Sequence, residues 1–417
     1  MSANKQYQRY HIDTQPTPDF VSWPNRFVVK VNRFELAKLL IGETFQQRGD
    51  MKAVTSRPCM YGTFSGPIGG FAPRPQHCVG CLRCTTQHPQ AVAILPNPER
   101  AKLGDSFFTF NHINAVTYEA DTGSIPVKGA GYRGKFGGEG WDGMWTDMSE
   151  IVRPTRDGIH GREFISTVVD IGEKLSYLIF DEQGQLSGIQ SRILSIPLPF
   201  IYDIPPKSAQ SDVVFEILAS TAQETQTLAI VPLESCKRLV EGGKLKAESV
   251  VPLFKLGEED QLPNLGFATR MIEFDLTHAQ LANFELPTSN IQLSDTIISA
   301  RVAYGEPETL LKLYDQGVRV FHLVADLHGH SADGRFVLEL IREAHLAFVE
   351  AGRRDEVTLI GSGGIIAAEH VPKAVISGLD AVALDTPLLV ALQAQFEGEC
   401  ADRENSQFRM PVGLPVA

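Results

Sequence analysis

One stretch, residues 357–392, most constrains what this chain can fold into. It opens with an apolar, β-branched run of strand length, and three glycines follow within four residues, at 361, 363 and 364. A helical pattern comes next, then a second apolar strand at 381–384 and the start of another helix. Repeated strand, turn and helix predict two consecutive units of a parallel α/β fold, because parallel strands need crossover helices.

The glycine turn is also a candidate anion site. Backbone N–H groups can close on a phosphate where no Cβ intervenes, and a helix N-terminus adds partial positive charge. The candidate cofactor-binding residues belong to this turn and to the start of the next unit's helix: Gly361, Ser362, Gly363, Gly364, Asp385 and Thr386. A turn that serves tight packing alone is the alternative interpretation.

The same alternation extends over the second half of the chain. Strands are predicted at 193–202, 227–233, 249–254, 271–276, 296–303, 318–325, 357–360 and 381–384, with the clearest helical patterns at 211–224, 307–316 and 335–352. Eight strands with crossover helices predict an α/β fold of the (β/α)8 TIM barrel type. The third unit is weak, since residues 257–268 hold little helical pattern.

Polar residues follow the sixth predicted strand. Asp326, His328 and His330 lie at its carboxyl end, the side of a TIM barrel where catalytic residues act. They are candidates for acid/base or substrate-binding groups. Structural hydrogen bonding is the alternative for each histidine.

A group of cysteines stands near the N-terminus. Cys78, Cys81 and Cys84 have C-x2-C-x2-C spacing with a proline five residues further on, which is typical of a ferredoxin loop around a 4Fe–4S cluster. The fourth ligand is open, because position 88 is His where a ferredoxin has Cys, and Cys59 lies 19 residues upstream. A structural zinc site on the same four cysteines is the alternative, although three ligands on one short loop favour a cluster.

The segments around the cysteines are less regular. Residues 1–55 predict a polar entry and one amphipathic helix whose apolar side carries Phe34, Leu36, Leu39, Leu40 and Phe45. Residues 91–126 predict mixed strand and loop. Seven glycines then fall between positions 129 and 143, among charged and aromatic residues, a composition unlike that of a flexible linker. Two interpretations remain open: an ordered loop that lies on top of a cofactor, and a domain connector held by salt bridges. The predicted divisions are 1–125, 126–190, 191–400 and 401–417.

Composition limits the function classes. The net charge of −12 argues against non-specific nucleic-acid binding, and no apolar run approaches the roughly 20 residues that span a bilayer. The polar N-terminus has no signal-peptide core, so a cytoplasmic protein is expected. Six cysteines are too few and too clustered for a disulfide framework. Direct NAD(P)H use is not expected, because no Gly-x-Gly-x-x-Gly motif stands in a βαβ setting.

Several of these runs carry a resemblance to a known family. Residues 318–334, 357–365 and 374–389, together with 144–171, resemble the FMN-binding synthase domain of glutamate synthases. The resemblance implies that the late barrel turns hold the FMN phosphate, and that Arg301 stands where the family has a lysine beside the flavin. It also implies electrons passing from a ferredoxin-type donor through the cluster to FMN, and on to a C=N substrate such as 2-iminoglutarate. Ammonia would come free or from a glutaminase partner, and the chain would work as an oligomer or complex subunit.

The chain also departs from the family. The sequence His328-Gly329-His330-Ser331 stands where the family has Gly-Gly-Thr-Gly, and the first barrel strand ends in Asp203 rather than in small residues. The family's 3Fe–4S cysteines are missing apart from Cys400, and no glutaminase domain is expected. These changes favour an alternative, a non-catalytic or electron-relay subunit with a degenerate flavin site. A phosphate-ligand isomerase or aldolase is a third hypothesis, which leaves the cysteines unexplained.

Overall fold

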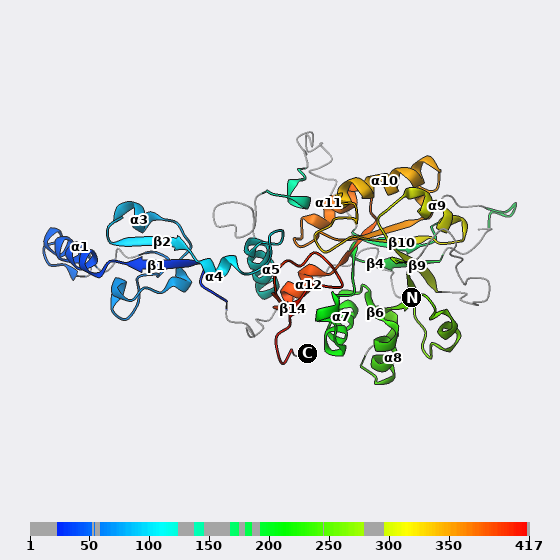
Figure 1. Cartoon of the computed structure of the whole chain (residues 1–417), viewed down its shortest axis with the longest axis horizontal. Coiled ribbons are helices and arrows are strands. Elements are labelled where there is room, and N and C mark those ends of the chain that lie inside the picture. The colour runs from blue at the N-terminus through cyan, green and yellow to red at the C-terminus, as the bar shows by residue number, and fades with distance from the viewer. Residues whose placement is uncertain are drawn as a thin grey trace.

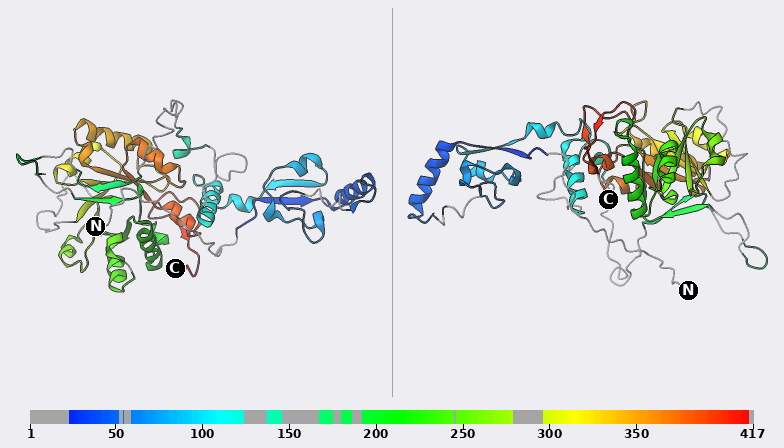
Figure 2. Two further views of the ribbon diagram at one scale, coloured as in Figure 1. Left: turned by 180° about the vertical axis from the view of Figure 1, so that it is seen from behind. Right: turned by 90° about the horizontal axis from the view of Figure 1, so that it is seen from below.

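The computed structural model describes residues 23–51, 54, 59–123, 137–145, 167–174, 180–185, 192–244, 246–278 and 296–414. Figure 1 shows a barrel at one end of the long axis and a small N-terminal module at the other, joined through two helices. The views in Figure 2 show the same separation. Among the described residues, no helix has the length and apolar character that crossing a bilayer requires.

The barrel is closed and has eight parallel strands in chain order. Its strands are β5 (Phe200–Tyr202), β6 (Ala229–Pro232), β7 (Val250–Lys255), β8 (Met271–Asp275), β9 (Ile297–Ala303), β10 (Val320–Val324), β11 (Thr358–Ser362) and β12 (Ala381–Leu384). β12 pairs with β5 and closes the ring. The predicted TIM-type barrel is confirmed.

Helices cover the outside of the barrel. They are α7 (Asp212–Thr225), α8 (Leu233–Glu241), α9 (Pro307–Asp315), α10 (Val337–Glu350), α11 (His370–Ser377) and α12 (Thr386–Ala391). In the third unit the described connection holds a 3-10 helix, η6 (Glu259–Asn264), and no α-helix. The weakness predicted there is confirmed, and most of the link from β8 to β9 lies outside the described residues.

The first predicted strand, 193–202, is wrong as a single element. Pro197 and Pro199 divide it, because proline lacks the N–H that a central strand needs. β4 (Ile193–Ile196) pairs antiparallel with β3 (Val169–Gly172), and β5 alone enters the barrel. The β3–β4 pair packs its buried Ile171, Leu194 and Ile196 against the apolar residues at the amino ends of the barrel strands.

The barrel interior changes character along its axis. Alternate strand residues face inward. Near the amino ends these are apolar, among them Ile201, Ile230, Met271, Ile297 and Val320. Two to four residues further along four of the strands they are polar, and the carboxyl half of the barrel therefore carries a buried layer of ionisable side chains: Asp203, Glu273, Arg301 and His322. This set is called the ionic layer below.

The N-terminal module is built on two antiparallel strands, β1 (Phe27–Val31) and β2 (Val92–Pro96). Helix α1 (Arg33–Gln46) is capped by the Asn32 side chain, which accepts hydrogen bonds from two backbone N–H groups. The predicted helix is confirmed, but its apolar side is only partly right. Leu36 is buried, whereas Phe34 and Phe45 are 76% and 80% exposed.

Two helices, α4 (Pro98–Ala101) and α5 (Phe110–Thr122), lead from the module to the barrel. The strand-and-loop prediction for 91–126 is right at β2 and wrong at α5. Ile113 and Val116, three residues apart, bury one helix face against Ile366 and Val390 of the barrel end, and this packing outweighs the β-branched composition.

The glycine-rich segment is described around η3 (Gly140–Gly143), while most of 126–190 lies outside the described residues. Asp142 accepts hydrogen bonds from Nε2 of His112 at 2.8 Å and Nε2 of His370 at 3.1 Å. Burial raises the pKa of Asp142, but the two histidines outweigh it and hold that pKa well below its usual range. Here the segment is a connector pinned between α5 and α11.

Candidate functional site

The cysteine segment lies against the strands of the N-terminal module. Cys78 precedes a tight loop, Cys84 lies in the short helix α3 (Arg83–Gln87), and both pack against the small core of β2. Cys81 is exposed. The supporting strands therefore hold the two outer cysteines of the motif and leave the middle one at the surface.

The loop geometry depends on two residues in the left-handed region, Gly80 at φ +72° and Leu82 at φ +58°. A Cβ at Gly80 would overlap the ring of Phe27, so glycine is required for packing as well as for conformation. These two left-handed residues bend the chain between Cys78 and Cys84.

Cys59 joins the other three cysteines. The pKa of the Cys78 thiol lies above its usual range, mainly through burial and also through the negative charges of Cys84, Cys59 and Cys81, so these three residues lie within electrostatic range of Cys78. The Cys59 sulfur lies 3.6 Å from the Thr63 hydroxyl. Burial raises the pKa of Cys59, but hydrogen bonds from Thr63 and from nearby backbone N–H groups outweigh it and lower that pKa. This setting stabilises a thiolate.

The spacing of the sulfurs bears on the kind of centre. Within the described ranges, no three of the four sulfurs lie within 4.8 Å of one another. Four thiolates around one zinc stand about 3.8 Å apart, given a Zn–S bond of about 2.3 Å.

The predicted phosphate cradle lies at the carboxyl ends of β11 and β12. The backbone N–H of Gly364 donates to the Leu327 carbonyl at 3.0 Å. The indole N–H of Trp141 donates to the Gly363 carbonyl at 3.4 Å. Both glycines have positive φ, and a Cβ at either would press on backbone of the 326–329 loop. The glycine turn is thus packed under protein, which is the alternative interpretation of its sequence.

The side chains of the cradle bind an arginine from the C-terminal segment. Arg403 donates to the Asp385 carboxylate at 2.6 Å and to the Ser362 hydroxyl at 3.1 Å. The same guanidinium donates to the Ala325 carbonyl at 2.7 Å and to Asp203 at 3.3 Å. Among the described residues the hydroxyl of Thr386, also predicted here, is buried without a hydrogen-bond partner.

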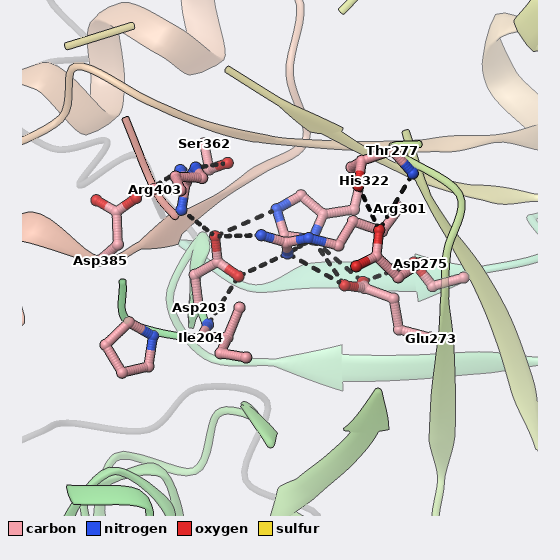
Figure 3. Close-up of polar contacts among 12 residues, drawn as sticks. Asp203, Ile204, Glu273, Asp275, Thr277, Arg301, His322, Ser362, Asp385 and Arg403 are labelled. Atoms are coloured by element: carbon pink, nitrogen blue, oxygen red, sulfur yellow. Dashed lines mark hydrogen bonds and ion pairs between the residues drawn. The ribbon is translucent and has the colours of Figure 1, made fainter. Parts of the chain in front are cut away.

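Arg301 lies inside the barrel, at the centre of the ionic layer (Figure 3). It donates to both oxygens of Asp203, at 2.6 and 3.2 Å, and to Glu273 at 3.3 Å. Burial disfavours the charged forms of Arg301 and Asp203, but the attraction between their opposite charges outweighs the effect of burial. The pKa of Asp203 is held well below its usual range, and that of Arg301 is held above. Arg301 is thus a buried cation with its charge already matched.

His322 completes this layer. Its Nδ1 lies 3.1 Å from both Glu273 oxygens and 3.2 Å from the Arg301 guanidinium. Its Nε2 is buried without a hydrogen-bond partner among the described residues, and the nearest carboxylate oxygen of Asp203 is 3.9 Å away.

The residues after β10 face the linker from the N-terminal module. Nε2 of His328 lies 2.7 Å from the carboxylate of Asp105, and its ring stacks on Phe107 with centroids 4.8 Å apart. Asp326 accepts the backbone N–H of His330 at 2.7 Å. These contacts match the structural interpretation of the histidines, and the structure does not bring His328 to Arg301.

Sequence reasoning missed four members of the network: Asp203 as an ion-pair partner, Glu273, His322 and Arg403. A signal for two of them was present. Glu273 and His322, like the predicted Arg301, each interrupt an apolar strand at an inward-facing position, and a buried charge needs a partner. No local signal marks Arg403, which reaches the barrel from 18 residues beyond Asp385.

Comparison with known proteins shows similarity to glutamate synthases. Residues 333–403 match the conserved region in glutamate synthase. The archaeal-type glutamate synthase (NADPH) of Dehalococcoides mccartyi is 24% identical over 379 residues, covering 78% of this chain and 75% of that protein. The archaeal glutamate synthase (NADPH) of Archaeoglobus fulgidus is 23% identical, covering 78% of this chain and 73% of that protein.

The chain is a distant homologue of the archaeal-type glutamate synthases, and it carries the conserved region of that family. Its barrel is of the TIM type. Among solved structures, inosine 5′-monophosphate dehydrogenase from Legionella pneumophila aligns with a TM-score of 0.36 and 17% identity, over 56% of this chain and 65% of that one, less than two thirds of its length.

Proposed function

We propose that this glutamate synthase-related chain is an iron–sulfur electron-transfer protein whose redox centre lies in the N-terminal module. The observation that carries the proposal is that Cys78, Cys81 and Cys84 share one short loop, with Cys59 within electrostatic range of Cys78. These four thiolates would hold a 4Fe–4S cluster, which supplies one-electron transfer when bound. The closeness of Cys59 to Cys78 favours Cys59 over His88 as the fourth ligand.

The family likeness favours FMN at the barrel mouth, but the residues at that place do not fit its phosphate in this structure. Ser362 and Asp385 hold Arg403, and the Gly364 N–H is bonded to Leu327. No step of the proposed function therefore passes through a flavin.

The position of the module supports the same proposal. Figure 1 and both views of Figure 2 place β1, β2 and α3 away from the barrel, beyond α4 and α5. Electron donor and acceptor would then be other proteins, a ferredoxin-type carrier or a redox partner subunit, rather than two centres in one chain.

A second candidate is the flavoenzyme that the family likeness implies, with electrons passing from the cluster to FMN and on to a C=N substrate such as 2-iminoglutarate. The glycine turn after β11 favours it, as does the buried Thr386 hydroxyl that lacks a partner within the described residues. Arg301 would be the cation beside the flavin, and Asp326 and His328 the candidate acid/base groups.

One measurement separates the candidates. Protein purified without oxygen is assayed for iron, sulfide, zinc and released flavin. Near four irons and four sulfides per chain with no flavin is the expected result. One FMN per chain beside the iron would replace the proposal with the flavoenzyme, and zinc without iron would remove the redox function.

A further inference from the structure

The charge of this chain is divided between its two ends. Residues 23–97 contain nine lysines and arginines and three acidic residues, a net charge of +6. The whole chain carries −12, so the remainder carries −18. No aspartate or glutamate occurs from residue 51 to residue 98, the stretch that contains all four module cysteines. The predicted redox centre therefore stands in a basic module on an acidic protein.

The surface next to the cysteines is apolar as well as basic. Met60, Val79 and Leu82, each adjacent in sequence to a cysteine, are 84%, 42% and 49% exposed. Arg74 and Arg83 are exposed too, and Arg83 follows Leu82 directly in the sequence. Arg74 is tied to the cysteine site through its backbone N–H, which donates to Thr63, the residue whose hydroxyl contacts Cys59. These five exposed residues are called the cysteine rim, and Cys81 beside Leu82 in the sequence is exposed as well.

A rim of this composition has the properties of a transient protein interface. Methionine and arginine are enriched in such interfaces, and a small apolar patch within a charged border gives specific but short-lived contact. Opposite charge steers the encounter over long distances, and complexes between electron-transfer proteins bury small areas. The arrangement of Figures 1 and 2 keeps the barrel off this module, so the rim is open to a partner.

We propose that the cysteine rim is the docking surface for a small acidic electron-carrier protein. The inference rests on the proposed iron–sulfur function, and it adds the surface, its residues and the charge of the partner. Charge complementarity decides the occupant, because a basic surface without acidic residues in its sequence stretch attracts a carrier whose surface is rich in aspartate and glutamate. The acidic barrel of a second copy is the competing occupant.

The test measures binding of the full chain to an immobilised acidic ferredoxin, with basic cytochrome c as the probe of opposite charge. Binding to the ferredoxin is expected at low salt, with affinity falling steeply as salt rises, and no binding to cytochrome c. Arg83→Glu and Arg74→Glu should each weaken binding about tenfold or more, which equals ~1.4 kcal/mol. Arg342→Glu, at an exposed position on α10, is the matched control and should leave binding unchanged.

Iron and sulfide counts on every variant keep the two proposals apart. Binding does not depend on turnover, so loss of binding with iron retained in Arg74→Glu supports the rim. Equal binding by wild type, Arg74→Glu and Arg83→Glu would overturn it, even with four irons present. The chain could instead form a dimer at low salt that Arg74→Glu dissociates, and show no affinity for ferredoxin. That result would overturn the proposal and identify the cysteine rim as a contact between two copies of this chain. A chain without iron that still binds ferredoxin would overturn the proposed function alone.

Discussion

The two predicted cofactor sites of this chain differ in what their polar groups already bind. In the N-terminal module the four cysteines are free thiols, and Cys81 is exposed. At the barrel mouth, Ser362, Asp385 and the glycine turn bind Arg403, Leu327 and Trp141 instead. Both sites have the residue types that their sequences predict. The comparison teaches that a motif marks where a ligand can bind, while long-range contacts decide whether the place is free.

The largest expected effect is on metal content. Cys81→Ser removes one thiolate, so iron should fall from near four per chain to near zero, because a partly liganded cluster is lost. His88→Ala is the matched control and should keep its iron if Cys59 is the fourth ligand. Iron lost from His88→Ala and kept in Cys59→Ser would reverse that assignment.

The ionic layer gives the largest expected effect on stability. Arg301→Met leaves Asp203 and Glu273 buried without their cation, and breaking such a pair costs about 3–5 kcal/mol in the free energy of unfolding. Arg238→Met removes an exposed partner of Asp212 and should cost about 0–1 kcal/mol. Urea unfolding of both variants measures the difference, and equal losses would mean that the layer does not hold the barrel together.

Acid should lower the free energy of unfolding through three carboxylates at and near the carboxyl end of the barrel. The pKa values of Asp203, Asp142 and Asp105 lie below those of the unfolded chain, so the unfolded state binds more protons as pH falls. Their stabilisation is complete above the unfolded value of about 4 and declines as pH falls below it. Urea midpoints between pH 7 and pH 2 should follow this course; a midpoint constant down to pH 2 would contradict it.

Substitution of Arg403 tests whether the site at the barrel mouth is blocked by its own side chains. Arg403→Ala leaves Asp385 and part of the Asp203 interaction unpaired, and should cost about 1–3 kcal/mol. Arg409→Ala removes an exposed ion pair with Glu397 and should cost about 0–1 kcal/mol. If Arg403 also keeps flavin out, equilibrium dialysis with FMN will detect binding in the variant alone, whereas FMN bound by the wild type would reopen the cradle as a flavin site.

The smallest expected effect is a gain. Gly42 lies inside α1 with nothing within 4 Å of an added Cβ, so Gly42→Ala should stabilise the module by about 0.5–1 kcal/mol. Gly80→Ala is the contrasting variant, because its positive φ and the Phe27 ring both oppose a side chain. Thermal unfolding that ranks the two variants in the opposite order would show that the cysteine loop is not fixed by Gly80.

The features that sequence predicted well are those with local or periodic signals. The barrel strands, the C-x2-C-x2-C loop and α1 each follow from patterns within a few residues. The features it missed join distant segments. Arg403 reaches Asp203 across 200 residues, and α5 is fixed by barrel contacts that overrule its own composition. Exposure of Phe34 and Phe45 was missed for the same reason, since periodicity shows a face but not whether anything covers it.

The β3–β4 pair makes the amino end of the barrel depend on residues that precede it in the chain. Gly172 N–H donates to the Thr358 hydroxyl at 3.1 Å, and the Lys174 ammonium donates to Asp380 at 3.0 Å. A fragment beginning at residue 198 would keep all eight barrel strands and yet expose the apolar floor beneath them to water. The shortest fragment able to fold as this barrel therefore starts at or before Val169, inside the segment that sequence alone assigns to a connector.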